Sequence, residues 1–262
     1  AANNTAIGNY SQGATTTGAS NTSVGSDSMA ANTTGHSNVA IGKGALLANT
    51  TGYRNTVVGF NASDASTTGR DNAIFGYEAG GTLTTGLENT FLGYYTGSAQ
   101  TSADYNTFVG STSGAATTTG ASNTAVGQGS MYANTTGASN TAVGRLALDA
   151  NTSADGNTAM GINALGATTT GNSNTAVGQN AGLLNTTGTM NAVLGNHAFD
   201  ANTTGGYNVA IGGNALSANT TAANNTAVGY ASLSANTTGA GNTALGHVAL
   251  TANTTGNSNV AV

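Results

Sequence analysis

The sequence has no cysteine and few charged residues, and these two deficits exclude several classes of function. Only 13 of its 262 residues are charged, with four lysines and arginines against nine acidic residues. The basic surface that nucleic acid requires is therefore missing. Without cysteine, the chain forms no disulfide and offers no thiolate to a metal. No apolar run is long enough to span a membrane.

Large apolar side chains are scarce as well. Leucine, isoleucine, valine and phenylalanine together number only 39, a smaller share than in ordinary globular domains. In a highly charged, aperiodic chain this composition would indicate disorder. The present chain carries little charge and is strictly periodic, so we expect it to fold.

What the chain does contain is a repeat of 17 residues. An asparagine recurs at this interval from Asn4 and Asn21 to Asn259 without interruption. In this register each unit resembles NTAVGxxALxANTTGxx, and we number its positions 1 to 17 from that asparagine. Position 4 is always a large apolar residue, position 5 is glycine in every complete unit, and position 13 is always threonine. Positions 6, 7, 10, 16 and 17 accept almost any residue, which indicates solvated corners.

The period and the residue types predict a solenoid. Seventeen residues are too few for two packed helices, and threonine, valine and isoleucine flanked by asparagine and glycine favour strands and turns. We predict an all-β parallel β-solenoid of about 15 coils. Positions 1 to 5 are expected to form one strand and positions 11 to 14 a second, with glycine at positions 5 and 15 where the chain bends.

The invariant asparagine and threonine columns are expected to form ladders of hydrogen bonds between coils, which hold the register. Representative ladder residues are Asn38, Asn55, Asn72, Asn89, Thr50, Thr67, Thr84 and Thr101.

We interpret residues 1–262 as one uncapped array that belongs to a longer protein. The sequence opens at position 15 of a unit and stops at position 4, and solenoids normally require capping repeats.

Positions 3 and 9 change size in opposite directions in most units, although Val193 is accompanied by Phe199 and Ala176 by Gly182. Ala142 and Ala210 at position 3 are accompanied by leucine at position 9, whereas Phe91 and Phe108 are accompanied by glycine. The two positions are therefore predicted to share one packed space.

The same columns predict a subunit interface. If the apolar residues of position 4 fill the coil, strand alternation directs position 3 outward. Position 3 is nevertheless apolar in 15 of 16 units, and a strand that is apolar on both faces is buried on both. We therefore predict that a second copy of the chain covers positions 3 and 9. The alternative is that position 3 is merely small and partly exposed. The predicted interface residues are Val57, Ile74, Phe91, Phe108, Leu148 and Leu216.

Two units carry a resemblance to a known family. NVAIGKGALLANTTG at residues 38–52 and NVAIGGNALSANTTA at residues 208–222 resemble the head repeats of trimeric autotransporter adhesins of the YadA type, and related repeats of tail-fibre-like proteins. The resemblance covers the whole chain. It implies a left-handed β-roll that packs as a homotrimer, with Val39 and Ile41 pointing into the roll and Ala40 outward.

The resemblance also implies a function and a location. The expected function is that of a non-enzymatic repeat region of an extracellular fibre on a cell surface or virion, as an adhesin head or spacer shaft. Copies of the chain are also candidates to join end to end into filaments through uncapped coil faces.

Aromatic side chains gather in the variable columns of residues 55–112. Phe60, Tyr77 and Tyr94 occupy position 6 of successive units, and Tyr95 follows. A row of exposed rings is suited to stacking on sugars, which makes these four residues a candidate surface for a glycan or a host surface. The alternative is that the rings pad a widened subunit interface.

The threonine columns suggest a second function. Regular, uncharged threonine ladders on a flat solenoid resemble the surfaces of ice-binding proteins. The strip would consist of positions 12 and 14. Purely structural ladders explain the same residues without a ligand, so ice binding is the alternative to the fibre.

No catalytic site, cofactor or metal is expected. His36, His197 and His247 occupy three different columns, so no histidine pair is assembled. Asp71 and Glu88 share position 17 of consecutive units, but arginines lie beside them, which favours an exposed salt-bridge ladder over a bound cation. The repeat also lacks the aspartate pattern of calcium-binding rolls.

Glycosylation sequons recur at position 12. The period generates them whether or not they are modified, and a glycosylating host would place sugar at regular intervals. The sequons begin at Asn32, Asn49, Asn134, Asn151, Asn185, Asn202, Asn219, Asn236 and Asn253.

Overall fold

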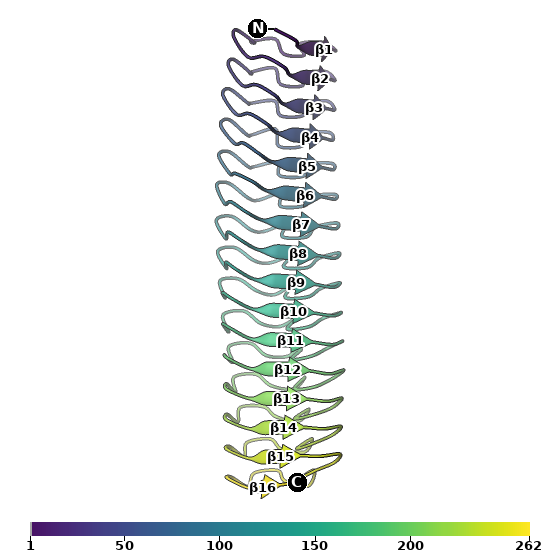
Figure 1. Ribbon diagram of the computed structural model, residues 1–262, viewed down its shortest axis with the longest axis vertical. Helices are drawn as coiled ribbons and strands as arrows, with labels where there is room; N and C mark the ends of the chain where they lie inside the picture. Colours follow the sequence, from purple (N-terminus) through teal and green to yellow (C-terminus); the bar gives the residue numbers. More distant parts are fainter. Residues whose placement is uncertain (1) are drawn as a thin grey trace. The chain divides into compact units, whose positions relative to one another are not determined.

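The computed structural model describes residues 2–262, which form a parallel β-solenoid with one short strand in each 17-residue coil (Figure 1). These residues form no helix, and therefore none that could cross a membrane. The chain comprises two compact units, each considered by itself. The first holds the described residues up to 129 together with 134–136, and the second holds 130–133 and 137–262.

Strands β1 to β15 occupy positions 2 to 4 of their coils and β16 occupies positions 2 and 3, so each is shorter than the strand predicted at positions 1 to 5. The strands of the first unit are β1 (Thr5–Ile7), β2 (Thr22–Val24), β3 (Val39–Ile41), β4 (Thr56–Val58), β5 (Ala73–Phe75), β6 (Thr90–Leu92), β7 (Thr107–Val109) and β8 (Thr124–Val126). Those of the second unit are β9 (Thr141–Val143), β10 (Thr158–Met160), β11 (Thr175–Val177), β12 (Ala192–Leu194), β13 (Val209–Ile211), β14 (Thr226–Val228), β15 (Thr243–Leu245) and β16 (Val260–Ala261).

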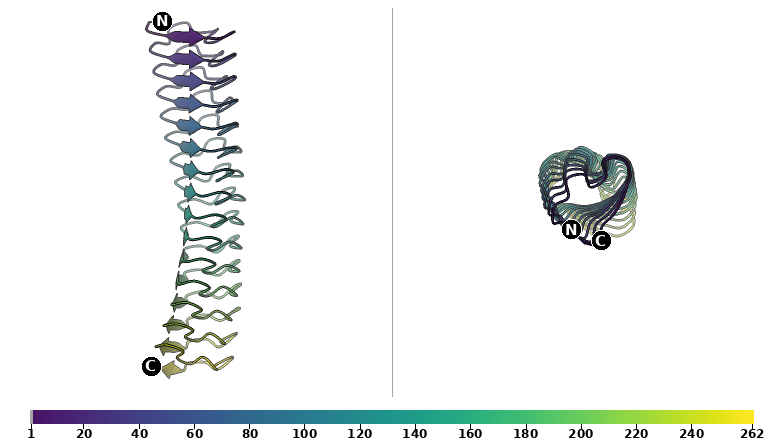
Figure 2. Two further views of the ribbon diagram at one scale, coloured as in Figure 1. Left: turned by 90° about the vertical axis from the view of Figure 1, so that its right-hand side faces the viewer. Right: turned by 90° about the horizontal axis from the view of Figure 1, so that it is seen from above.

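Within each unit the neighbouring strands are parallel and in register. Phe91 of β6 pairs with Phe108 of β7, and Ala210 of β13 pairs with Ala227 of β14. Each residue therefore lies beside the residue 17 positions later, as the repeat predicted. Seen from above, the chain of each coil runs around one narrow interior (Figure 2).

The second strand predicted at positions 11 to 14 is not formed. Three consecutive N–H groups of this segment converge instead on one carbonyl of the next coil. Those of Thr33, Thr34 and Gly35 donate to the carbonyl oxygen of Thr50 at 3.0, 3.0 and 3.2 Å. Donors that converge in this way bend the backbone, whereas successive N–H groups of a strand point in opposite directions. The segment is a turn, although its threonines have high strand propensity.

The predicted orientation of the strand is also wrong. Position 3 points into the coil, and positions 2 and 4 point outward. Ala40 is fully buried, whereas Ile41 is 40% exposed, which reverses what the resemblance implied for these residues. The physical reason is space. Buried side chains of positions 1, 8 and 12 already occupy the narrow interior, so it accepts only the middle side chain of each strand.

Positions 3 and 9 do share one packed space, but this space lies inside the coil. Phe91 and Phe108 are fully buried, and their rings stack with centroids 5.3 Å apart. A Cβ on Gly114 would lie 2.5 Å from the Phe108 ring, and one on Gly97 would lie 2.9 Å from the Phe91 ring. Phenylalanine at position 3 therefore requires glycine at position 9 in these coils.

Glycine at position 5 is required by both backbone angle and space. At Gly93 φ is 145°, and a Cβ would lie 2.5 Å from the carbonyl oxygen of Gly110 in the next coil. Position 15 is different, because Gly86 lacks a positive φ and Ala103 occupies the equivalent site one coil later. Only the first of the two predicted glycine bends depends on the conformational freedom of glycine.

Positions 7, 9 and 17 of each coil adopt the left-handed conformation, in most coils with a residue other than glycine. Examples are Glu78 with φ 48°, Leu46 with 53° and Arg54 with 56°. Such a residue costs of order 1–3 kcal/mol and persists only where the surroundings hold it. The stacked neighbours supply that constraint here, which is why columns of varied residue type keep one backbone path.

The shared space of positions 3 and 9 leads to a compensation experiment. We expect Phe108→Ala to destabilise the first unit by about 3–5 kcal/mol through a cavity, and Gly114→Leu by about 1–3 kcal/mol through overpacking. The double variant recreates the alanine and leucine pair of other coils, so most of the loss should be recovered. Urea denaturation followed by circular dichroism measures all three. A double variant as unstable as the sum of the single ones would contradict the shared space.

Candidate functional site

The asparagines of position 1 form a buried ladder that connects successive coils. The Oδ1 atom of each residue accepts the backbone N–H of the next, as from Asn72 to Asn55 at 3.1 Å and from Asn89 to Asn72 at 2.9 Å. The Nδ2 group donates to the carbonyl of position 15, as from Asn55 to Gly69 at 2.8 Å. Asn38 belongs to the same series. Protein atoms thus satisfy these buried amides, apart from the Nδ2 group of Asn225, which has no hydrogen-bond partner within residues 2–262.

The threonines of position 13 form a second ladder nearer the surface. The hydroxyl of Thr50 donates to the carbonyl of Thr67 at 3.1 Å, and Thr67, Thr84 and Thr101 donate in the same way. Because these hydroxyl hydrogens are used within the chain, the column joins coils and is not a row of free donors.

Position 12 adds a third ladder, which is buried. Asn49 Nδ2 donates to Asn32 Oδ1 at 2.8 Å, and Asn219 Nδ2 donates to Asn202 Oδ1 at 3.0 Å. The ice-binding strip predicted at positions 12 and 14 is therefore wrong, since only position 14 faces solvent. The same burial makes the sequon asparagines of this column inaccessible to glycosylation in the folded chain. The exception is Asn253, which is partly exposed.

The six residues predicted to contact a second chain lie in the cores of their own coils. Each has an exposed fraction of 0% in the single chain. They leave no surface for a partner, so the interface predicted at positions 3 and 9 is wrong. The residues are Val57, Ile74, Phe91, Phe108, Leu148 and Leu216.

The apolar column that the chain leaves exposed is position 4. In the first unit Phe75 is 37% and Leu92 is 50% exposed, and in the second unit Leu194 is 49% and Ile211 is 37% exposed. Position 2, beside it on the outward strand face, is mostly threonine, and neither column contains a charged residue in any coil. Each unit thus presents an uncharged, partly apolar strip along its strands. Strips of this kind mark interaction surfaces.

The aromatic residues of position 6 stack on one another. The ring centroids of Phe60 and Tyr77 are 5.2 Å apart, and those of Tyr77 and Tyr94 are 5.6 Å apart, with interplanar angles of 7° and 21°. Tyr95 packs edge-on against Tyr94 at 4.5 Å. Because neighbouring rings cover the faces between them, a sugar has no access to those faces along the row. The prediction that sugars stack flat on the rings of this row is therefore wrong for the ring faces that lie between neighbours.

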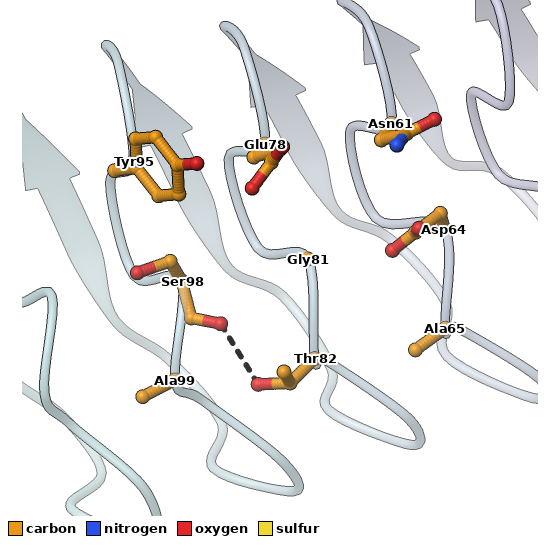
Figure 3. Close-up of a pocket in the computed structure, with 9 residues that line it drawn as sticks. All are labelled: Asn61, Asp64, Ala65, Glu78, Gly81, Thr82, Tyr95, Ser98 and Ala99. Atoms are coloured by element: carbon orange, nitrogen blue, oxygen red, sulfur yellow. Dashed lines mark hydrogen bonds between the residues drawn. The ribbon is translucent and has the colours of Figure 1, made fainter.

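A groove of about 650 Å³ lies beside this aromatic row (Figure 3). One wall carries Asn61, Glu78 and Tyr95, which occupy position 7 of three successive coils. The other wall carries Asp64 and Ser98, which occupy position 10. Of the predicted ligand surface, only Tyr95 lines the groove. The polar lining residues Asn61, Asp64, Glu78 and Ser98 were missed, because in sequence they are scattered over the variable columns 7 and 10.

Two carboxylates make the groove negative. Partial burial raises the pKa of Asp64, and the nearby charge of Glu78 acts in the same direction. A hydrogen bond to the Glu78 carboxylate raises the pKa of Tyr95 to about 12, and the same carboxylate raises the pKa of Tyr77. At neutral pH both phenols are therefore protonated.

Other ionisable side chains form partly exposed pairs. Arg54 Nε lies 2.7 Å from Asp71 Oδ1, but Glu88 has no ion pair within residues 2–262, so the predicted salt-bridge ladder is short. His197 Nδ1 lies 3.0 Å from Asp200 Oδ2, a pairing within one coil that the comparison of columns missed. Across residues 2–262, no group of three acidic, histidine or cysteine side chains is placed to hold a metal ion.

Mutations in the ladders of positions 1 and 13 are expected to lower the stability of the fold by different amounts. Asn208 Oδ1 accepts the Asn225 N–H at 3.0 Å, and its Nδ2 donates to the Ala222 carbonyl at 3.0 Å. Asn208→Ala should therefore lower the stability of the second unit by about 2–3 kcal/mol, because buried partners lose their hydrogen bonds. Thr220→Val removes one bond to the Thr237 carbonyl, which also accepts a backbone N–H, so a loss of about 1 kcal/mol is expected. Urea denaturation measures both, and equal losses would contradict this order.

The Tyr95 phenol predicts a pH dependence. Its pKa is raised in the folded chain, so the Glu78 interaction stabilises the fold fully below pH 10.0 and is lost as the pH rises towards 12. We expect Glu78→Gln to return the Tyr95 pKa towards 10.0, as followed by the chemical shift of its ring carbon Cζ. Glu88→Gln is the matched control and should leave it unchanged. Ionisation of Tyr95 near pH 10 in the unmodified chain would refute the interaction.

No model of a known protein family matches the chain, and no curated protein is detectably similar to it in sequence.

Proposed function

We propose that this chain is a non-enzymatic repeat region of an extracellular surface fibre, in which three copies pack side by side as left-handed β-rolls. It serves there as an adhesin head or a spacer shaft. The observation that carries the proposal is the exposed, uncharged apolar column at position 4 of the coils in both units. The resemblance of the NVAIG units to trimeric adhesin heads supports the number three.

A second copy of the chain is the partner that fits this column best. The exposed side chains recur once per coil, so a partner must offer apolar groups at the same spacing. The chain itself does so, because its strands stack with a constant 17-residue register. The lack of charge at positions 2 and 4 also lets identical surfaces meet without like-charge repulsion or the desolvation of ions.

The energy of such contacts is small per coil and accumulates by repetition. Covering the exposed half of a leucine such as Leu92, which is 50% exposed, contributes on the order of 1 kcal/mol. Summed over the coils of a unit, these increments are comparable with the several kcal/mol that association costs in lost freedom of motion. A long repeat array therefore associates through a strip that would be too weak in one or two coils.

The three ladders supply the other property that a fibre needs. Successive coils are joined by side-chain hydrogen bonds at positions 1 and 13, and also at position 12 where asparagine follows asparagine, as shown by Asn55, Thr50 and Asn49. Slippage of one coil by one residue would break all three series at once. The resulting rigidity suits a shaft or head that holds a binding surface away from its anchor.

A second candidate function is ice binding through the outward face of the strands, at positions 2 and 4. Thr90 and Thr107 of position 2 stand beside apolar Leu92 and Val109. Unlike the threonines of position 13, their hydroxyls have no hydrogen-bond partner within residues 2–262. A regular row of free hydroxyls beside methyl groups is the feature that favours this alternative.

The mass in solution tests the fibre. One chain has a mass of 25.2 kDa, and the trimer has three times that mass, about 76 kDa. We expect the trimer for the unmodified chain by light scattering, and the monomer for Leu92→Glu combined with Val109→Glu, which place charges on the strand face. Thr85→Glu with Thr119→Glu is the matched control, because these exposed residues lie at position 14, and it should remain trimeric.

An unmodified chain of 25.2 kDa would contradict the fibre proposal. Ice binding would then take its place, with thermal hysteresis that the Leu92→Glu and Val109→Glu substitutions abolish.

A further inference from the structure

Charged and aromatic side chains are concentrated in one part of the first unit. Eight of the 13 charged residues lie between Lys43 and Asp104, a stretch that also contains the stacked rings of position 6. The groove lined by residues between Asn61 and Ala99 lies within it. We propose that this groove binds a neutral oligosaccharide. The inference rests on the proposed adhesin role and names the class of ligand.

The groove is open because of a glycine. Gly81 occupies position 10 between Asp64 and Ser98 in the neighbouring coils. A Cβ at Gly81 would meet only the Glu78 carbonyl oxygen at 3.5 Å and an Asp64 carboxylate oxygen at 3.8 Å. The space beyond is unfilled.

In the second unit the equivalent site at position 10 is filled by a side chain. Asp149 and Gly166 there repeat the succession of aspartate and glycine at position 10. A Cβ on Gly166, however, would lie 3.3 Å from the side chain of Leu183. A leucine therefore occupies the place that Ser98 leaves open in the first unit, and Asp149 is a matched control for Asp64. Burial raises the pKa of both aspartates.

Most polar groups of the groove serve as hydrogen-bond acceptors, and the Asn61 amide can also donate. The Thr82 hydroxyl already donates to the Ser98 carbonyl at 2.8 Å (Figure 3), and the Ser98 hydroxyl is directed at the Ala115 carbonyl at 3.4 Å.

Asp64 and Glu78 have no ion pair within residues 2–262. Glu78 accepts hydrogen bonds from the Tyr77 and Tyr95 phenols, and Asp64 accepts them from backbone N–H groups. Because a carboxylate has about four acceptor sites, both retain acceptor positions for a ligand. A ligand must bring several donors, as the hydroxyl groups of a sugar do.

The rest of the lining suits the apolar face of a sugar ring. Tyr95 stands at one end of the groove, and Ala65 and Ala99 place methyl groups along it. Sugar rings combine such C–H faces with a rim of hydroxyl groups, which matches a surface of ring, methyl and carboxylate. The volume of about 650 Å³ lies within the roughly 300–1,000 Å³ of small-ligand sites.

Charge separates the possible ligands. The two carboxylates repel sulfated or carboxylated glycans. They do not suffice for a metal, because no third acidic or histidine side chain joins them among residues 2–262. An amine is the remaining competitor, since carboxylates and aromatic rings attract cations. The extent and apolar lining of the groove favour the neutral sugar over a single ammonium group.

A printed array of neutral, amino and acidic glycans tests the proposal. The labelled full chain should bind neutral oligosaccharides and no acidic ones. Gly81→Leu fills the groove without backbone strain, because leucine already stands at position 10 in Leu47, and it should abolish binding. Calorimetric titration of the best-bound neutral glycan should show that Asp64→Asn and Glu78→Gln each weaken binding about tenfold or more. Asp149→Asn should bind like the unmodified chain.

Binding to no neutral glycan, binding to amino glycans alone, or equal binding by Gly81→Leu would each overturn the proposal. Circular dichroism verifies that each variant is folded. Light scattering on the same samples separates the two proposals. A trimer without sugar binding refutes the groove alone, and a sugar-binding monomer refutes the fibre alone.

Discussion

Hydrogen bonding between stacked asparagine side chains is the constraint from which the other features of this solenoid follow. Each Oδ1 of position 1 holds the backbone N–H of the next coil, as Asn72 does for Asn89. This hydrogen bond forms only if the chain returns to the same place after a constant number of residues. An insertion in any unit would therefore break it. The amides also occupy the coil interior. Together with position 12 they leave room for a single apolar side chain from each strand.

The thin core explains the character of the surface. Since only position 3 fits inside, the branched and aromatic residues of position 4 remain outside, and Ile41 and Leu92 are 40% and 50% exposed. An array with this apolar column gains from association with its own copies, which is the basis of the proposed fibre. The corners are fixed by stacked neighbours and not by residue type. They are therefore free to carry chemistry, and the groove at Asp64, Glu78 and Tyr95 is built from such corners.

Several features could be predicted from the sequence, because each depends on the residues at one position of the repeat or on a comparison of two positions. The 17-residue period predicted the length of the coil and the register of its strands. The inverse relation of side-chain size between positions 3 and 9 predicted that Phe108 and Gly114 share a space. The predicted second strand failed because threonine favours strands on average, whereas three N–H groups directed at the Thr50 carbonyl require a turn. The groove was missed because its polar lining comes from the variable positions 7 and 10 of three coils. Only stacking brings Asn61, Glu78 and Tyr95 into one wall.

The sequence by itself determined the repeat length, the presence of one strand within positions 1 to 5 and the residues that pack together, because these follow from periodicity and volume. It did not determine which face of the strand is the inside. Positions 3 and 4 are both apolar, so alternation permits two solutions, and the one predicted was wrong. The tertiary structure decided between them through interior volume. Buried amides such as Asn72 fill the coil, so Ala40 fits where Ile41 does not.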